Sequence, residues 1–256
     1  MRAKRVYYYE DNNLKVMAST ARYRFSLPYI KNMVVLDIGC GARCGPWILS
    51  GVVSKVVGID VSGEAISYCL KNWSKDNISY LMADAVDLPF PDQSFDAVVS
   101  FEVIEHLDDC QQYLAEVSRV LKPAGVFILS TPNRPVTSPD GVFTNPDHIR
   151  EYDSKEFTNI LASQFTGITL YGQMPSDKVI RAENLLKQAY QDSDKVPTLI
   201  KCFLSKGLRK LMFDKYLSFS ARIKTLPTPN QISEDDFFFE RDRTEKARYL
   251  LAVCMK

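Results

Sequence analysis

The amino-acid sequence predicts an α/β protein with a mostly parallel sheet, and two features of the chain indicate this fold. Short apolar runs such as MVVLDI, residues 33–38, are typical of strands buried on both faces, and they alternate with segments of helical spacing. A turn with three glycines directly follows the first of these runs. Such alternation favours parallel strands joined by helices, with ligands bound at the carboxyl ends of the strands.

Seven segments of the chain are predicted as strands: 33–38, 55–60, 78–84, 95–101, 126–130, 167–171 and 247–255. Helices are predicted just after the glycine turn and at residues 64–73, 109–121 and 156–165. Residues 133–150 are rich in Pro, Asn and Asp, which predicts a long loop. Helical periodicity without a matching strand marks an insertion at about 175–235. We therefore expect a single domain over residues 1–256, with a helical lid formed by this insertion.

The composition of the chain excludes several classes of protein. With 46% hydrophobic residues, 25% charged residues and a net charge of +1, it has the balance of an ordinary globular domain and no general nucleic-acid signal. No apolar run approaches the roughly 20 residues of a membrane-spanning helix, and the start, MRAKRVYYYEDNN, lacks the apolar core of a secretory signal. Six scattered cysteines without a CxxC pair predict reduced thiols, so we expect a cytoplasmic protein.

The insertion is basic, with 11 Lys and Arg against five Asp and Glu between residues 176 and 226. Its stretch 199–219 places apolar side chains on one side of a predicted helix and most of its basic side chains on the other. Packing against the protein's own core is the ordinary role of such a stripe. Two alternatives stay open, namely peripheral contact with anionic lipid and a basic rim for a phosphorylated or lipid-linked acceptor.

The carboxylates at the strand ends indicate which nucleotide the glycine turn binds. The turn GCGARCG, residues 39–45, is one residue longer than a dinucleotide site requires, which argues against NAD. Asp37, at the end of the first strand, would repel a phosphate but suits an ammonium group. Asp60 closes the second strand, where it can accept from ribose hydroxyls, and Asp84 closes the third, where it can accept from an adenine amino group. S-adenosylmethionine, a cationic adenosine ligand without phosphate, fits this pattern.

Four stretches resemble the class I S-adenosylmethionine-dependent methyltransferases in order and spacing: LDIGCG, VVGIDVS, MADAVDLPFPDQSFDAVVS, and EVIEHLDD followed by LKPAGVFILSTPN. The resemblance covers residues 30–133 and implies a Rossmann-like, seven-stranded sheet with helices on both faces. It also implies a cofactor site, with the methionine end at the glycine turn, the ribose at Asp60 and the adenine beyond it. The implied cofactor residues are Asp37, Gly39, Cys40, Gly41, Asp60, Val61, Asp84, Ala85 and Phe101. Arg43 stands where the family's loop usually has a third glycine, so we expect the path of this loop to differ.

The acceptor of the methyl group is indicated by a further resemblance. NPDHIREYDSKEF, residues 145–157, and ARYRFSLPYI, residues 21–30, are similar to a subgroup associated with sugar, glycan or secondary-metabolite modification. His148 would then lie above the sulfonium as a general base or substrate contact, because a hydroxyl acceptor must lose its proton. Arg150 and Tyr152 are expected at the acceptor, although these three residues could equally tie down the loop. O-methylation of a small molecule is preferred, and N-methylation of an amino sugar needs the same architecture.

Glu102, Glu105 and His106 form an E-x-x-E-H motif. The same motif occurs in ubiquinone-biosynthesis O-methyltransferases, where a divalent cation can assist the acceptor, but the larger family often carries it without a metal. We expect these side chains to line the acceptor pocket or to cap the following helix, with Glu102 at the acceptor and His106 as a second catalytic residue. No metal is predicted, and a chelator should leave activity unchanged.

Two other classes of function are weighed against a small-molecule methyltransferase. A protein that binds S-adenosylmethionine without catalysis stays open, because Arg43 departs from the family pattern and few bases are obvious. Turnover of the cofactor to S-adenosylhomocysteine separates that case from an enzyme. A nucleic-acid methyltransferase is disfavoured, since SFEVIEHL stands where a base-flipping motif would follow the fourth strand. The expected partner is therefore a small molecule and not a nucleic acid.

Overall fold

The computed structural model describes residues 13–143, 145–184 and 232–256. The chain divides into two compact units, of which the first comprises Met1–Met174 with Phe238–Lys256 and the second comprises Pro175–Phe237. The second unit has nearly the bounds of the predicted insertion, and its residues 177–184 are helical. The predicted helix at 199–219 lies outside the described residues, as does most of the predicted lid. The description below concerns the first unit.

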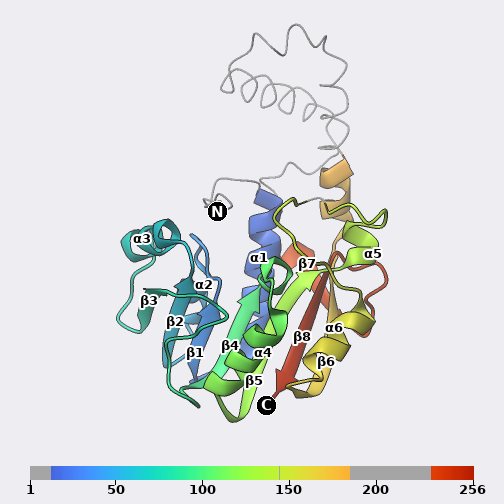
Figure 1. Cartoon of the computed structure of the whole chain (residues 1–256). Helices are drawn as coiled ribbons and strands as arrows, with labels where there is room; N and C mark the ends of the chain where they lie inside the picture. Colours follow the sequence, from blue (N-terminus) through green and yellow to red (C-terminus); the bar gives the residue numbers. More distant parts are fainter. Residues whose placement is uncertain (1–12, 144, 185–231) are drawn as a thin grey trace, which may run out of the picture. The chain divides into compact units, whose positions relative to one another are not determined.

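Eight strands form one sheet in the order β3-β2-β1-β4-β5-β8-β6-β7 (Figure 1). Their bounds are β1 Val34–Ile38, β2 Lys55–Asp60, β3 Ile78–Met82, β4 Phe95–Phe101, β5 Leu121–Pro132, β6 Thr166–Pro175, β7 Phe237–Arg241 and β8 Tyr249–Met255. Strands β1 to β5 are parallel, whereas β8 runs antiparallel to both β5 and β6. All seven predicted strands are present, but the expectation of seven was wrong by one. Strand β7, with the sequence FFFER, lies at the sheet edge and lacks the alternation of apolar and polar residues that predicts a strand.

The helices of the first unit, including short 3-10 turns labelled η, are α1 Asn13–Ser26, η1 Leu27–Tyr29, α2 Gly45–Leu49, α3 Gly63–Asn72, η2 Ile104–His106, α4 Cys110–Val120, α5 Arg134–Thr137 and α6 Ser154–Leu161. The longer ones begin at side chains that cap their free amides. Ser62 accepts from Ala65 N at the start of α3. Asp153 and Glu156 form a reciprocal capping box at α6, which starts that helix earlier than its apolar spacing predicts. The predicted loop at 133–150 contains the short helix α5.

Helices cover both faces of the sheet, as the sequence predicts (Figure 1). On one face, Leu114 of α4 and Phe157 of α6 pack with Leu36 and other strand residues that point to the same side. On the other face, Tyr23 of α1 packs with Val35, the strand neighbour of Leu36. Because successive strand residues point to opposite faces, the continuous apolar run of β1 contributes to both cores.

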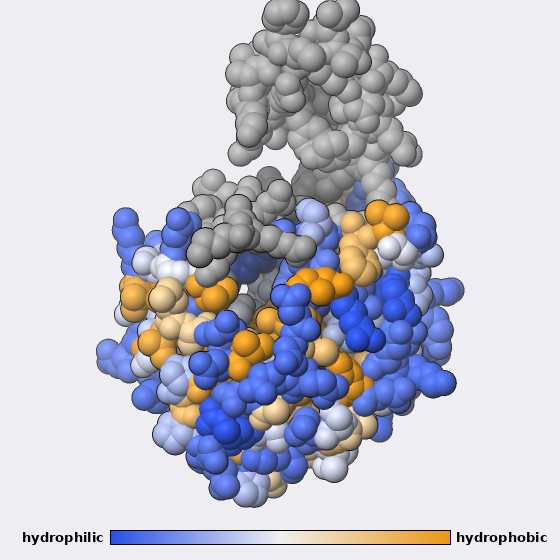
Figure 2. Space-filling model, viewed as in Figure 1, coloured by the Kyte–Doolittle hydropathy of each residue, from blue (hydrophilic) through white to orange (hydrophobic). Residues whose placement is uncertain are grey.

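The surface of the first unit is mostly polar on the face drawn in Figure 2, where hydrophobic residues are scattered among hydrophilic ones. Among the described residues, no helix combines the length and the apolar character that crossing a membrane would require.

Candidate active site

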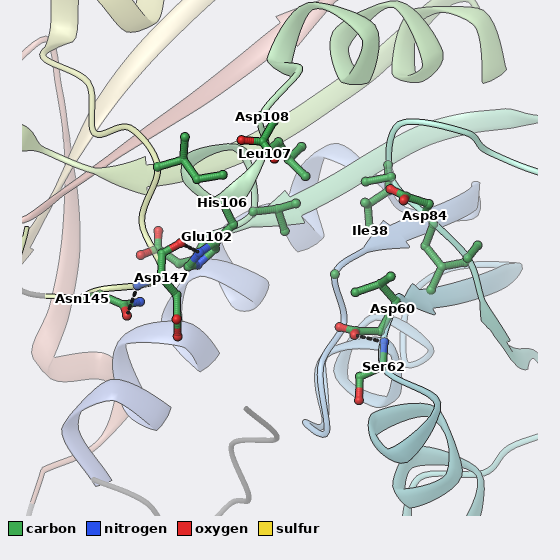
Figure 3. A pocket seen from close by; sticks show the side chains of 17 residues that line it. Ile38, Asp60, Ser62, Asp84, Glu102, His106, Leu107, Asp108, Asn145 and Asp147 are labelled. Atoms are coloured by element: carbon green, nitrogen blue, oxygen red, sulfur yellow. Dashed lines mark hydrogen bonds between the residues drawn. The ribbon is translucent and has the colours of Figure 1, made fainter. Parts of the chain in front are cut away.

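A cavity of about 770 Å³ opens at the carboxyl ends of β1, β2 and β4. Figure 3 shows its side chains in two groups that face each other across the space. One group comes from the ends of β1 and β2 and from the turn after β3, and includes Asp60 and Asp84. The other comes from the turn after β4 and from the loop before α6, and includes Glu102, His106 and Asp147. The parallel strands thus bring two predicted sites, for cofactor and acceptor, into one cavity.

The Asp60 carboxylate organises the first side of the cavity. One of its oxygens accepts from Gly41 N at 2.9 Å and the other from Ser62 N at 2.8 Å. Each carboxylate oxygen has a second lone pair, so Asp60 can still accept from a ligand hydroxyl. Val61, which is 46% exposed, and Ala85 line the same side. An exposed apolar surface beside a carboxylate that can still accept hydrogen bonds fits an adenosine, which has a flat base joined to a ribose diol.

The glycine turn is shaped by backbone conformations that favour glycine. Gly39 has φ +72° and Gly41 φ +58°, both in the left-handed region. The amides of Gly39 and Cys40 donate to the carbonyl of Ile59, which fastens the turn to β2. A Cβ on Gly39 would overlap Cγ2 of Val103, a residue that also lines the cavity. The turn packs closely against Val103 at the edge of the cavity, which is possible because Gly39 has no side chain.

Three predicted cofactor residues lie behind the cavity surface and not on it. Asp37 is completely buried, and its two oxygens accept from the Tyr23 hydroxyl at 3.0 and 3.2 Å. Phe101 is buried against the edge of the Tyr23 ring, and Cys40 is also buried. None of the three belongs to the cavity lining. Asp37 thus anchors α1 through Tyr23, and its predicted contact with the cofactor would have to come from behind the cavity lining.

The buried Asp37 predicts how stability changes with pH. Burial raises the pKa of Asp37 well above its usual range. Below the unfolded-state pKa of about 4 the carboxyl is neutral in both states. As the pH rises through that value the unfolded chain releases the proton first, so Asp37 lowers the free energy of unfolding progressively until its folded-state pKa is reached.

We therefore expect Asp37→Asn to gain stability relative to the original chain when the pH is raised from about 5 to about 8. Chemical unfolding at both pH values measures this difference. Tyr23→Phe removes the hydroxyl that stabilises the charged carboxylate, so it should raise the pKa of Asp37 further and extend the fall in stability to higher pH. If the difference in the free energy of unfolding between Asp37→Asn and the original chain were the same at both pH values, this account of Asp37 would be contradicted.

Glu102 begins the second side of the cavity in an unusual backbone conformation. Its φ is +61°, a left-handed value that is uncommon for residues other than glycine. Its side chain accepts from the Ser130 hydroxyl at 2.8 Å, and its amide donates to the Ser130 carbonyl at 3.1 Å. Both bonds fix the turn after β4 against the end of β5. Glu102 lines the cavity, and its place at the acceptor stays a prediction.

Glu105 is completely buried just behind this side. One carboxylate oxygen accepts from the Thr131 hydroxyl at 3.4 Å, and the other, Oε1, has no hydrogen-bond partner within the described part of the chain. Burial, and to a smaller extent the neighbouring Glu102, raises the pKa of Glu105 well above its usual range. The backbone carbonyl of Glu105 accepts from the amides of Ile149 and Arg150, which attaches the loop before α6 to η2.

The two histidines of the chain lie together, with ring centroids 4.9 Å apart. Nδ1 of His106 is 2.9 Å from the carbonyl oxygen of Asp147. Nδ1 of His148 is 2.6 Å from Oε1 of Glu151, whose other oxygen accepts from Thr137 and Ser138. Glu151 is not among the predicted site residues, although its position three residues after His148 is a signal visible in the sequence.

The remaining acceptor residues are placed differently from the prediction. Tyr152 is 1% exposed and packs against Phe157 in the core, so it is not an acceptor contact. Arg150 is exposed, stacks over the Tyr152 ring and does not line the cavity. His148 is itself just behind the lining, with 10% of its side chain exposed. Asn145, Asp147 and Ile149 of the same loop line the cavity instead.

Comparisons with known proteins agree with the fold. Residues 36–129 match the family described as methyltransferase domain. The chain is 39% identical over 128 residues, 50% of its length, to a probable S-adenosylmethionine-dependent methyltransferase of Mycolicibacterium smegmatis, of which 49% is covered. It is 33% identical over 115 residues, 43% of its length, to the ubiquinone biosynthesis O-methyltransferase of Rhodopseudomonas palustris, of which 44% is covered.

The fold is also similar to that of a solved structure, the N-methyltransferase NodS of Bradyrhizobium japonicum in complex with S-adenosyl-L-homocysteine. The TM-score is 0.57 at 17% identity, over 96% of this chain and 89% of that one. The chain spans about half the length of the curated relatives it matches. Residues 36–129 thus match a methyltransferase domain, and the relatives that share this part of the chain include a probable S-adenosylmethionine-dependent methyltransferase.

Proposed function

We propose that this methyltransferase domain transfers a methyl group from S-adenosylmethionine to a hydroxyl of a small molecule, such as a sugar, a glycan precursor or a secondary metabolite. The observation that carries the proposal is that one cavity has a side suited to an adenosine, around Asp60, and an opposite side with titratable groups, around Glu102 and His106. Relatives that act as S-adenosylmethionine-dependent methyltransferases, one of them an O-methyltransferase, support it. S-adenosylmethionine supplies an already activated methyl group on its sulfonium.

The described residues fit this cofactor. Asp60 would accept from the ribose hydroxyls, Val61 and Ala85 would contact the adenine, and Asp84 would accept from its amino group. The methionine end would extend toward Gly39, whose backbone lines the cavity. Asp37 would support this end from behind, through the buried contact with Tyr23.

The acceptor oxygen would enter from the side of Glu102 and His106. In the transfer, the oxygen forms a bond to the methyl carbon while the carbon–sulfur bond breaks, and neutral S-adenosylhomocysteine leaves. The hydroxyl proton must also depart, and we assign its removal to the pair of histidines, His106 and His148. Holding donor and acceptor in line is otherwise the main requirement, because the leaving group needs no further activation.

N-methylation is a second function that one observation favours. Carboxylates of Glu102, Asp108 and Asp147 line the acceptor side of the cavity, and such groups attract an amine. The structural similarity to an N-methyltransferase is compatible with this alternative. The same carboxylates disfavour a phosphorylated acceptor in the described cavity.

Methyl transfer from methyl-labelled S-adenosylmethionine into an extract of the source organism tests the proposal. We expect label in a defined product together with stoichiometric S-adenosylhomocysteine, and the bond to the label identifies an oxygen or nitrogen acceptor. Tight binding of the cofactor without any product in extract or in a panel of alcohols and amines would favour a binding protein without catalysis. Label in nucleic acid would contradict the small-molecule acceptor.

Asp60→Ala tests the pose of the cofactor. Loss of the bonds to the ribose should weaken binding of S-adenosylmethionine by about 1–3 kcal/mol. Calorimetric titration measures the dissociation constant, and Asp76→Ala, which removes an exposed carboxylate outside the cavity lining, is the matched control. Because Asp60 also accepts from Gly41 N, a thermal melt of the variant checks that the turn is retained. Unchanged affinity in a folded variant would overturn the pose.

A further inference from the structure

A compact group of metal-ligating side chains lies beside the acceptor side of the cavity. Glu105, His106 and His148 each offer one ligand atom, and these atoms lie within 4.8 Å of one another. Glu105 and His106 belong to η2, and His148 belongs to the loop before α6. The backbone bonds from Ile149 and Arg150 to the Glu105 carbonyl hold the two segments together. Residues far apart in the sequence are thereby fixed in one place.

Each histidine has one ring nitrogen, Nδ1, held by an acceptor group. The Asp147 carbonyl is an acceptor, so Nδ1 of His106 carries the proton and Nε2 keeps its lone pair. The Glu151 carboxylate faces Nδ1 of His148 and imposes the same arrangement. Ligating histidines almost always donate their second ring N–H to a carbonyl or a carboxylate in this way. Glu151 is itself held by Thr137 and Ser138, so the ring orientation is firmly set.

The carboxylate of Glu105 supplies an independent observation. Glu105 is completely buried, and its Oε1 has no hydrogen-bond partner among the described residues. A buried polar atom without a partner is costly and rare in folded proteins, unless an ion or water completes its bonding. The Arg22 guanidinium lowers the pKa of Glu105 electrostatically, but among the described residues it makes no hydrogen bond to Oε1. A metal cation held by Glu105 and one ring nitrogen of each histidine would give Oε1 a partner.

From these observations we propose that Glu105, His106 and His148 bind a divalent transition-metal cation. Two imidazoles and one carboxylate suit zinc or iron better than magnesium or calcium, which prefer oxygen ligands. Three protein ligands leave at least one coordination position open, and His106 turns the site toward the cavity that it lines. This revises the expectation from the sequence that the E-x-x-E-H motif acts without a metal.

The site stands on its own geometry and goes beyond the proposed function. If both hold, the open position takes the acceptor hydroxyl and lowers its pKa, so that the proton passes to water. The histidines then act on the acceptor through the cation instead of as free bases.

Titration of the full, metal-stripped chain with zinc chloride tests the site. We expect one zinc ion per chain by calorimetry, and a loss of affinity of more than about 100-fold in His106→Asn and in His148→Asn. Glu151→Gln leaves the three ligands intact but loosens His148, and should weaken binding by about 10–100-fold. Asp147→Asn is the control, because it removes a cavity carboxylate while keeping the carbonyl that holds His106, and it should bind zinc within about threefold of the original chain.

Retained affinity for S-adenosylmethionine shows that each variant is folded. Zinc binding that persists in both histidine variants would assign the ion to thiols and overturn the proposal, as would no binding. Zinc binding without methyl transfer to any acceptor would leave the metal site standing and overturn the proposed function. Methyl transfer by a chain that binds no zinc would overturn the metal site and leave the proposed function standing.

Discussion

Replacing His148 with alanine is expected to lower the rate of methyl transfer by roughly 10²–10⁴-fold, while the affinity for S-adenosylmethionine stays unchanged. The residue lies on the acceptor side of the cavity, away from the groups assigned to the adenosine. Steady-state kinetics with a fixed acceptor and calorimetric titration of the cofactor measure the two quantities separately.

The size of this effect follows from how tightly His148 is held. Its contact with Glu151 is 2.6 Å, and the Glu151 side chain is completely buried. The ring is therefore set in one orientation before any acceptor arrives, and its alignment requires no further loss of conformational freedom. A free base and a cation ligand both depend on this alignment, so the loss of activity is expected in either case, and the zinc titration separates the two.

A merely structural role for His148 predicts a different outcome. His148→Asn keeps an N–H donor for Glu151 but has no ring nitrogen to bind a proton or a metal. If the residue only ties down the loop, this variant should recover activity. If His148 acts on the acceptor, the variant should be as inactive as His148→Ala while melting closer to the original chain. Full activity in His148→Ala would end its role in the reaction.

The fold could be predicted because local pattern and tertiary structure agree over residues 33–132. Strand β1, VVLDI, is buried on both faces, and the sequence shows this as a short run that is apolar except for Asp37. Strand β7 could not be predicted in the same way, because FFFER at a sheet edge is half exposed and its pairing is set by the neighbouring β6.

The candidate site could be predicted from the sequence where its residues lie at the carboxyl ends of recognisable strands. Asp60 is the last residue of β2 and Asp84 lies two residues beyond the end of β3, so the rule for parallel sheets places them in the cavity. Asp37 follows the same rule but is buried outside the cavity lining, where its carboxylate accepts from Tyr23 of a helix before the first strand. The meeting of Glu105 with His148 could not be read from the sequence, because 43 residues separate them and only the folded loop brings them together.

Replacing Gly39 with alanine is expected to destabilise the fold by about 2–5 kcal/mol, for two separable reasons. Its φ of +72° is unfavourable for any residue with a Cβ, at a cost of about 1–2 kcal/mol. A Cβ would also overlap Cγ2 of Val103. Valine is branched at Cβ and has few rotamers, so it cannot easily turn away from the added methyl.

Gly41→Ala is a matched control for the first cause. Gly41 has a similar φ, +58°, but a Cβ there would meet nothing within 4 Å. It should therefore lose only the conformational part, about 1–2 kcal/mol, as measured by chemical unfolding. Equal destabilisation at Gly39 and Gly41 would mean that the contact with Val103 is relieved without cost.

The second cause is isolated by a double-mutant cycle with Val103→Ala, which removes the overlapping methyl. In that background, Gly39→Ala should cost no more than Gly41→Ala does in the original chain, which leaves a coupling of about 1–3 kcal/mol. Val103 precedes η2, so the cycle measures how closely the glycine turn is packed against the segment that carries Glu105 and His106. Zero coupling would show that the two sides of the cavity adjust independently. The expected coupling would mean that the contact between Gly39 and Val103 sets the position of the turn relative to the acceptor side. A change at Gly39 should then also alter the affinity for zinc.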